Sequence, residues 1–220
     1  CPKYERLPSV DPKVYTMNNL LRWLAVEVVG GSWMSDYDTV PLVAPLTKLP
    51  DDGRITVHQG ATPALVSGQP SEFGRMAALF ANVYYMDHAN VSASTFVVRG
   101  KRHVSDQPLL DAMLQMGLLW RAPHRVVQPD AADFANAGAS TCPYASRPVQ
   151  PPLLALHFAH NEVGRAQEAA RTSRGTCVCG KPVTNIHLSS SSHFRVPLIE
   201  TCARFWYGGC AAPGRSCVSS

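Results

Sequence analysis

The residues best suited to chemistry are the cysteines and histidines near the end of this 220-residue sequence. Thiolate and imidazole groups are ligands that zinc prefers, and four of them complete a tetrahedral site. An odd total of seven cysteines does not fit a closed disulfide framework within the chain. Three states therefore stay open for these thiols: a zinc site, disulfides formed in an oxidising compartment, or free cysteines. The candidate ligands are Cys177, Cys179, His187, His193, Cys202 and Cys210.

The spacing of these cysteines matches known zinc motifs poorly. One residue separates Cys177 from Cys179, and seven residues separate Cys202 from Cys210, whereas zinc-binding pairs usually lie about two to four residues apart. Cys142 stands alone without a motif that would mark a nucleophile, so we expect it to be an ordinary small apolar residue. The sequence thus predicts no catalytic residue and no cofactor, and it leaves a metal site undecided.

A second candidate group lies between residues 153 and 171, where the spacing of opposite charges favours a helix. His157 and His160 are three residues apart in this segment, with Glu162 close by, so on a helix the two imidazoles could share a metal ion. The H-E-x-x-H pattern of zinc peptidases, the nucleophile elbow and the phosphate-binding loop are all absent from the sequence. We therefore expect both histidines to be packed or surface residues.

The stretch 202–210 reads C-A-R-F-W-Y-G-G-C and is similar to the core of Kunitz inhibitors. Ile186 stands where a Kunitz domain needs a further cysteine, and Cys217 alone follows where the fold needs two. We interpret this similarity over nine residues as a coincidence, and no reactive loop is carried over from it.

The composition indicates a surface that faces other protein. Charged residues make up 16% of the chain, against roughly 25% in ordinary soluble domains. No run of about 20 apolar residues could span a bilayer, so no membrane contact is expected. The chain begins with Cys1 rather than Met, and its 18 prolines favour long ordered loops. We therefore expect a fragment of a larger protein that packs within an assembly.

Basic residues are scattered within a mild net charge of +4. The densest group is Arg99, Lys101, Arg102 and His103. A dedicated nucleic-acid binder would show a clustered basic stripe with interleaved aromatic residues. We expect a solvated turn here, which could contact RNA without sequence preference.

Apolar spacing predicts helices over 17–29, 71–87 and 153–171, and a further helix that begins at Ser105 or Asp106. Thr16 can cap the first helix, whose core face we expect to include Val28. The second helix is apolar most of the way round, with Tyr85 and Met86 on its second side, so we expect it to be fully buried. The predicted core residues are Leu20, Leu21, Leu24, Phe73, Met76, Phe80, Val83, Tyr84, Leu110, Met113 and Leu114.

Three short strands are expected, over 55–58, 95–99 and 125–128, with loops over 32–54 and 129–152. The fold class is therefore α+β, mainly helical, with a few short strands and long Pro-rich loops. Gly, Ser and Cys replace the apolar periodicity after residue 171. We expect a globular α-rich region over 1–171 and an irregular Cys/Ser/Gly-rich tail over 172–220.

The stretch Gln69 to Arg121 resembles the α-rich capsid (coat) protein of totivirus-like double-stranded RNA viruses. The residues that carry the resemblance are S-E-F-G-R at 71–75, F-A-N-V-Y-Y-M at 80–86, and the segment 105–120. The resemblance implies a subunit that assembles with copies of itself, or with other shell subunits, into a closed shell around RNA. It also implies no cofactor and a location in the virion or the host cytoplasm.

Two other classes of protein stay open. The cysteines of the tail and the glycosylation triplet Asn90-Val91-Ser92 would suit a secreted, disulfide-stabilised binding protein. The loose histidine and cysteine groups would suit a metal- or thiol-dependent enzyme. Low charge and the lack of a catalytic motif favour the structural, self-assembling class.

Overall fold

The computed structural model shows an α+β fold with helices and small sheets. The chain divides into two compact units, which are residues 1–36 with 46–123 (unit 1) and residues 37–45 with 124–220 (unit 2). The structure describes residues 5–42, 53–86, 89–119, 125–129 and 154–159, together with residues 165, 177–178 and 181–182.

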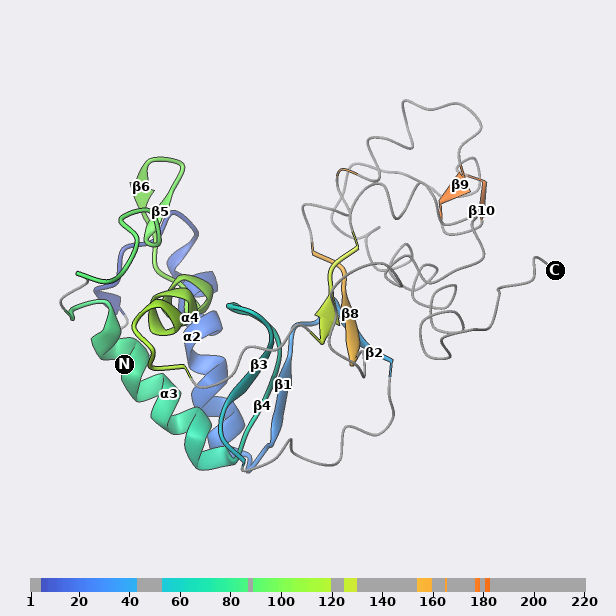
Figure 1. Ribbon diagram of the computed structural model, residues 1–220, viewed down its shortest axis with the longest axis horizontal. Coiled ribbons are helices and arrows are strands. Elements are labelled where there is room, and N and C mark those ends of the chain that lie inside the picture. The colour runs from blue at the N-terminus through green and yellow to red at the C-terminus, as the bar shows by residue number, and fades with distance from the viewer. Residues whose placement is uncertain are drawn as a thin grey trace. The chain divides into compact units, whose positions relative to one another are not determined.

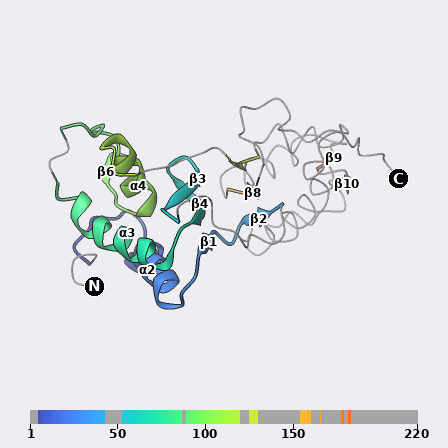
Figure 2. The same cartoon turned by 60° about the horizontal axis from the view of Figure 1, so that its bottom comes forward.

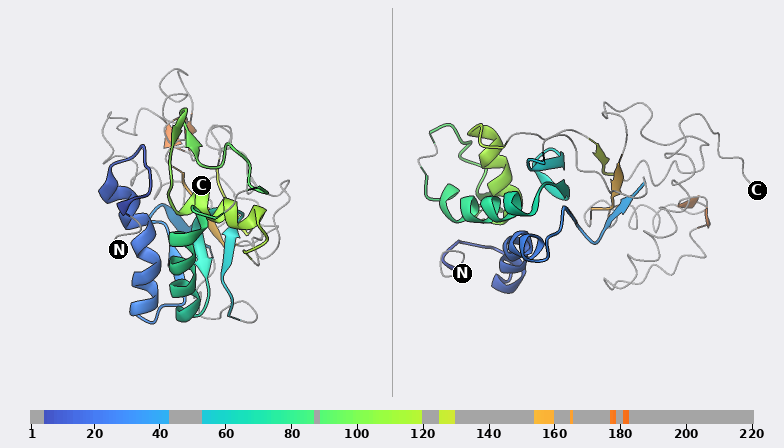
Figure 3. Two further views of the ribbon diagram at one scale, coloured as in Figure 1. Left: turned by 90° about the vertical axis from the view of Figure 1, so that its left-hand side faces the viewer. Right: turned by 90° about the horizontal axis from the view of Figure 1, so that it is seen from below.

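Unit 1 packs helices against one side of a small antiparallel sheet (Figure 1). The sheet has the strand order β1-β4-β3, in which Val66 lies opposite both Met34 and Val57. Figures 2 and 3 show α2 and α3 side by side, and α4 also contacts β4. The elements are α2 (Lys13–Val28), β1 (Trp33–Ser35), β3 (Thr56–Gln59), β4 (Thr62–Ser67), α3 (Pro70–Val83), β5 (Val97–Val98), β6 (Lys101–Arg102) and α4 (Asp106–Gln115).

The described strands of unit 2 form two small sheets. One has the order β2-β8-β7, with β2 antiparallel and β7 parallel to β8, and the other pairs β9 with β10. The elements are β2 (Thr39–Pro41), β7 (Val126–Val127), β8 (Ala155–His157), β9 (Cys177–Val178) and β10 (Lys181–Pro182). No helix in the described part of the chain is both long and apolar enough to cross a membrane.

Aromatic packing between α2 and α3 forms the centre of the core of unit 1. Trp23 lies with its ring centroid 5.0 Å from that of Phe80, edge to face, and 5.7 Å from that of Phe73. Seven predicted core residues are buried, and Leu21, Leu24, Tyr84 and Leu114 are partly buried against them. The confirmed buried residues are Leu20, Phe73, Met76, Phe80, Val83, Leu110 and Met113.

The first helix starts at a different residue from the predicted one, and its buried face contains different residues. It starts at Lys13, after Pro12 at the N-cap position, so Thr16 lies inside the helix and does not cap it. The Thr16 hydroxyl instead bonds the Ser9 hydroxyl at 2.6 Å. Val28, which we expected on the core face, is 83% exposed. The period of about 3.6 residues per turn explains the difference, because it carries Val28 well round the helix from the buried Trp23.

The second helix is shorter than predicted and is not fully buried. α3 ends at Val83 instead of residue 87, and Tyr85 and Met86 follow it as exposed residues. Ala78 and Asn82 form a solvent-facing side. One face of α3 packs on α2 and α4, and this one-sided packing leaves the other face to water.

Two further predictions are wrong in whole or in part. The expected loop over 32–54 contains β1 and β2, and the expected helix over 153–171 is wrong at Ala155–His157, which form β8. Arg165, in the same range, is helical, and its neighbours lie outside the described residues. A short apolar run does not by itself distinguish a strand from a helix, and here pairing with β2 and β7 decides.

The predictions of four other elements are confirmed. The strands expected at 55–58, 95–99 and 125–128 correspond to β3, β5 and β7, and the helix expected at Ser105 or Asp106 is α4. The boundary near residue 172 stays a prediction. Most of the tail lies outside the described residues, although β9 and β10 form a short hairpin there.

Candidate functional site

A buried ionic group joins α2 to the start of α4. The Arg22 guanidinium donates hydrogen bonds to Asp106 Oδ2 from Nε at 3.0 Å and from Nη2 at 2.6 Å, and the Trp23 indole donates to the same oxygen at 3.2 Å. Arg22 Nη1 pairs with Asp36, which follows β1. Asp106 is 3% exposed, and its Oδ2 atom accepts all three of these hydrogen bonds. The group therefore ties elements together and offers no surface to a substrate.

Burial and the neighbouring charges shift the pKa values of both Asp106 and Arg22. Burial raises the pKa of Asp106, and the charge and hydrogen bonds of Arg22 counteract the rise. Burial also works against the charge of Arg22, but the neighbouring Asp106 and Asp36 outweigh it and raise the pKa of the guanidinium. Each partner therefore favours the charged form of the other, although for Asp106 burial outweighs this effect and its pKa stays raised.

The outer face of α2 is uncharged and mostly apolar, and it is a functional candidate in unit 1. Its exposed residues include Val14 at 72% and Val28 at 83%, and Val29, which follows the helix, is 79% exposed. Exposed Asn18 and Ala25 and half-buried Leu21 complete a stripe with steps of four and three residues, the spacing of a helix that packs on another helix. We call Val14, Asn18, Leu21, Ala25 and Val28 the α2 stripe.

The charged residues of α2 do not lie on this stripe. Arg22 turns inward to Asp106, and the carboxylate of Glu27 lies over Gly74 of α3, where a Cβ atom would collide with it. Lys13 at the start of the helix donates to the Glu5 carbonyl at 2.8 Å. The sequence analysis missed the stripe because it assigned Val28 to the core. The four-three spacing from Val14 to Val28 is the signal that could have revealed it.

The predicted basic group lies on the β5–β6 hairpin. Arg99, Lys101 and Arg102 are exposed, whereas His103 is 7% exposed and belongs to the interior. The structure brings Tyr84 beside this hairpin, with its hydroxyl accepting a hydrogen bond from Arg102 Nη1 at 3.2 Å. The sequence analysis missed this neighbour because the aromatic residue comes from the end of α3.

A serine, a histidine and an aspartate meet near the start of α2. Ser9 Oγ lies 3.3 Å from His103 Nδ1, and His103 Nε2 lies 3.8 Å from Asp11 Oδ2. The backbone N–H of Val10 also donates to Nδ1 at 3.3 Å. Nδ1 therefore already accepts a hydrogen bond from the backbone N–H of Val10 and is poorly placed to take a proton from Ser9. This arrangement attaches the N-terminal segment to β6 and does not activate a nucleophile.

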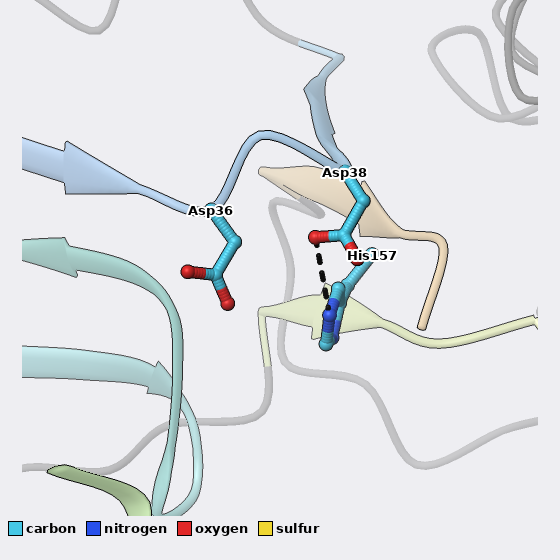
Figure 4. Close-up of side chains that lie close together, drawn as sticks. All are labelled: Asp36, Asp38 and His157. Carbon is cyan, nitrogen blue, oxygen red and sulfur yellow. Dashed lines mark ion pairs between the residues drawn. The ribbon is translucent and has the colours of Figure 1, made fainter. Parts of the chain in front are cut away.

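In unit 2, His157 lies on β8 and not on a helix, so the expected helical pair of His157 and His160 is wrong. His157 Nε2 lies 3.5 Å from Asp38 Oδ1, and both side chains are buried (Figure 4). Asp36, also drawn in Figure 4, belongs to unit 1, where its carboxylate pairs with Arg22. The Asp38–His157 pair supplies two groups, fewer than the three protein ligands of a catalytic zinc site. We interpret it as a buried polar contact between β8 and the residue that precedes β2.

Most of the other predicted candidates lie outside the described residues. Cys177 lies in β9, without a described side chain, and the Kunitz-like stretch 202–210 falls outside the described residues. The remaining candidates outside them are Cys142, His160, Glu162, Cys179, His187, His193, Cys202, Cys210 and Cys217. Their roles stay predictions.

Comparisons with known proteins identify no relative. No family model matches the chain, and no curated protein or solved structure matches it. The class that the fold defines is therefore a small α+β protein, and its function has to be argued from its own residues.

Proposed function

We propose that the chain is a structural protein that associates with copies of itself through the α2 stripe. The observation that supports this proposal is the absence of charge from the exposed positions of α2 between Val14 and Val28. Exposed apolar residues that follow one helix face are typical of a helix with a partner. Burying an exposed valine contributes on the order of 1 kcal/mol, so several such residues on each side favour association.

A second copy is the partner that suits the stripe best. In an antiparallel pair with its twofold axis at Leu21, Val14 of one copy faces Val28 of the other. The same register brings Asn18 to within one residue, about 1.5 Å along the axis, of the level of Ala25. The small side chain of Ala25 leaves room for the larger amide. A strongly charged partner would find no counter-charge on this face. The stripe is thus complementary to itself in shape and polarity.

This proposal includes the capsid function as its more specific form. A totivirus-like shell subunit would contact copies of itself, need no cofactor, and occur in the virion or the host cytoplasm. The segment 69–121 that suggested this family spans α3, the β5–β6 hairpin and α4. A closed shell needs more than one kind of contact between subunits, and the α2 stripe would be one of them.

The test is the molar mass of the full chain by light scattering, over a range of concentrations, with and without reductant. The proposal predicts a mass that rises with concentration, and a shift toward monomer for Val28→Lys. Asn82→Lys is the matched control, because it adds the same charge to the exposed side of α3. A monomer at every concentration would contradict the proposal. Association that reductant abolishes would favour the secreted, disulfide-stabilised class instead.

A further inference from the structure

The β5–β6 hairpin has a tight turn that displays a basic residue at its tip. Val97 pairs with Arg102 and Val98 with Lys101, which leaves Arg99 and Gly100 as the two-residue turn. Both turn residues have positive φ, 52° at Arg99 and 72° at Gly100. This geometry is that of a type I′ turn, in which Asn-Gly is the preferred pair. An arginine at the first position adopts an unfavourable backbone conformation, so placing Arg99 in this turn costs conformational free energy.

Three exposed cations lie together on this hairpin, and the half-exposed Asp11 carboxylate lies near its base, 3.8 Å from His103 Nε2. Arg99, Lys101 and Arg102 are exposed, and the sequence contains no acidic residue from Ala89 to Ser105. Arg99, Lys101 and Arg102 are therefore not neutralised by carboxylates from their own segment. Such a group attracts the phosphates of a nucleic acid and releases the counterions bound to them.

An aromatic cluster lies directly beside the cations. The Tyr84 ring contacts Phe96 edge to face, with centroids 5.3 Å apart, and contacts Tyr85 in the same way at 5.2 Å. The Arg102 guanidinium lies 6.0 Å from the centre of the Tyr84 ring. Tyr85 itself is 57% exposed. Phe96 and Arg102 thus hold Tyr84 in place, and Tyr84 supports an exposed ring at the edge of the basic group.

We propose that this surface, formed by Tyr84, Tyr85, Arg99, Lys101 and Arg102, binds single-stranded nucleic acid without sequence preference. The three cations contact phosphates of the bound strand, which passes round the hairpin because Lys101 and Arg102 point to its opposite faces. A base stacks on the exposed ring of Tyr85. Cations that follow the backbone, next to an aromatic ring that receives bases, are the combination that single-strand binding proteins use. A duplex hides its base faces within its own stack, so this ring selects for single strands. The proposal does not rest on self-association.

The experiment is fluorescence anisotropy with the full chain and a labelled oligouridylate of about 12 nucleotides, within the usual site sizes. The expected slope of log affinity against log salt is about −2, since each neutralised phosphate of a single strand contributes about −0.7. Tyr85→Leu keeps an apolar side chain but removes the ring, and should weaken binding about tenfold. A deoxythymidylate of equal length should bind similarly, because stacking and phosphate contacts do not require the 2′-hydroxyl. RNA binding that is tighter by tenfold or more would overturn this stacking account.

Arg99→Asn separates binding from folding. Asparagine tolerates positive φ, so the variant should melt at the same or a higher temperature than the unmodified chain while its salt slope falls to about −1.4. Arg54→Gln is the matched control for charge, because it also removes one exposed cation. Arg54 lies near the start of α3, whereas Tyr85 follows the end of that helix. The proposal is overturned by an absence of binding at low salt. It is equally overturned if Arg54→Gln weakens binding as much as Arg99→Asn, or if a duplex binds as tightly as the single strand.

Discussion

Arg22 of α2 forms a buried ion pair with Asp106 at the start of α4, and this contact keeps a positive charge off the outer face of α2. Two nitrogens of the Arg22 guanidinium donate to one oxygen of Asp106, at 3.0 and 2.6 Å. This contact turns the only arginine of the helix inward, toward α4, and thereby leaves the α2 stripe without a cation. Stability of the fold and the availability of an apolar surface therefore follow from the same side chain.

Replacing Arg22 with methionine should destabilise the fold strongly. Met keeps much of the apolar stem but leaves the buried Asp106 carboxylate without its cation, so the free energy of unfolding should fall by about 3 kcal/mol or more near neutral pH. Chemical denaturation measures this change. Arg75→Met is the control, because the Arg75–Glu72 pair is more exposed and should cost less than about 1 kcal/mol. Equal effects of the two substitutions would contradict the role of Arg22.

The same variant should show a characteristic pH dependence. Without Arg22, burial raises the pKa of Asp106 further above its ordinary value of 3.8. The native state then holds this proton to higher pH than the unfolded state, so stability falls as the pH rises from 3.8 through the raised value. The destabilisation by Arg22→Met should therefore be larger near neutral pH than near 3.8. A destabilisation that grows on acidification would have the wrong sign.

Glu72 should show the opposite dependence. Its hydrogen bonds with Arg75, at 2.9 and 2.8 Å, lower the pKa of the carboxyl below its ordinary value of 4.5. Its stabilisation is present above 4.5 and is lost as the pH falls through the lowered folded value. Glu72→Gln should thus cost about 0.5 kcal/mol near neutral pH, and this difference should vanish in acid. Paired denaturation curves against pH measure it, and a constant difference would contradict this assignment.

Phe80→Ala should cost about 3–5 kcal/mol, because the Phe80 ring is fully buried and stacks edge to face on Trp23. The midpoint of chemical denaturation measures the loss. Asn82→Ala, at an exposed position of the same helix, should change the midpoint little. An unchanged midpoint for Phe80→Ala would refute the packing of α2 against α3.

The sequence predicted elements well where local signals agree. α4 was expected because Ser105 and Pro108 mark its start and Leu110 and Met113 recur at helical spacing. α3 was expected from its apolar positions, of which Phe73, Phe80 and others are buried. Its end was misplaced because Tyr85 and Met86 continue the apolar pattern after the helix has stopped.

Elements and sites that depend on distant partners could not be predicted in this way. β8 is a strand because β2 and β7 pair with it, and these partners lie far away in the sequence. The basic hairpin gains its aromatic neighbour only when the end of α3 folds beside it, since Tyr84 and Arg102 are 18 residues apart. The α2 stripe could be predicted only if the buried side of the helix, which contains Trp23, were already known.

Restoration of association by opposite charges tests the central proposal most directly. Val14→Glu and Val28→Lys each place a charge on the α2 stripe, at the helix end where the helix dipole favours it, so neither should unfold the monomer. The proposal predicts that each single variant is shifted toward monomer in light scattering. The double variant should associate again, because the two new charges face each other across the antiparallel pair. Single variants that associate like the unmodified chain, or a double variant that stays monomeric, would contradict self-association through this face.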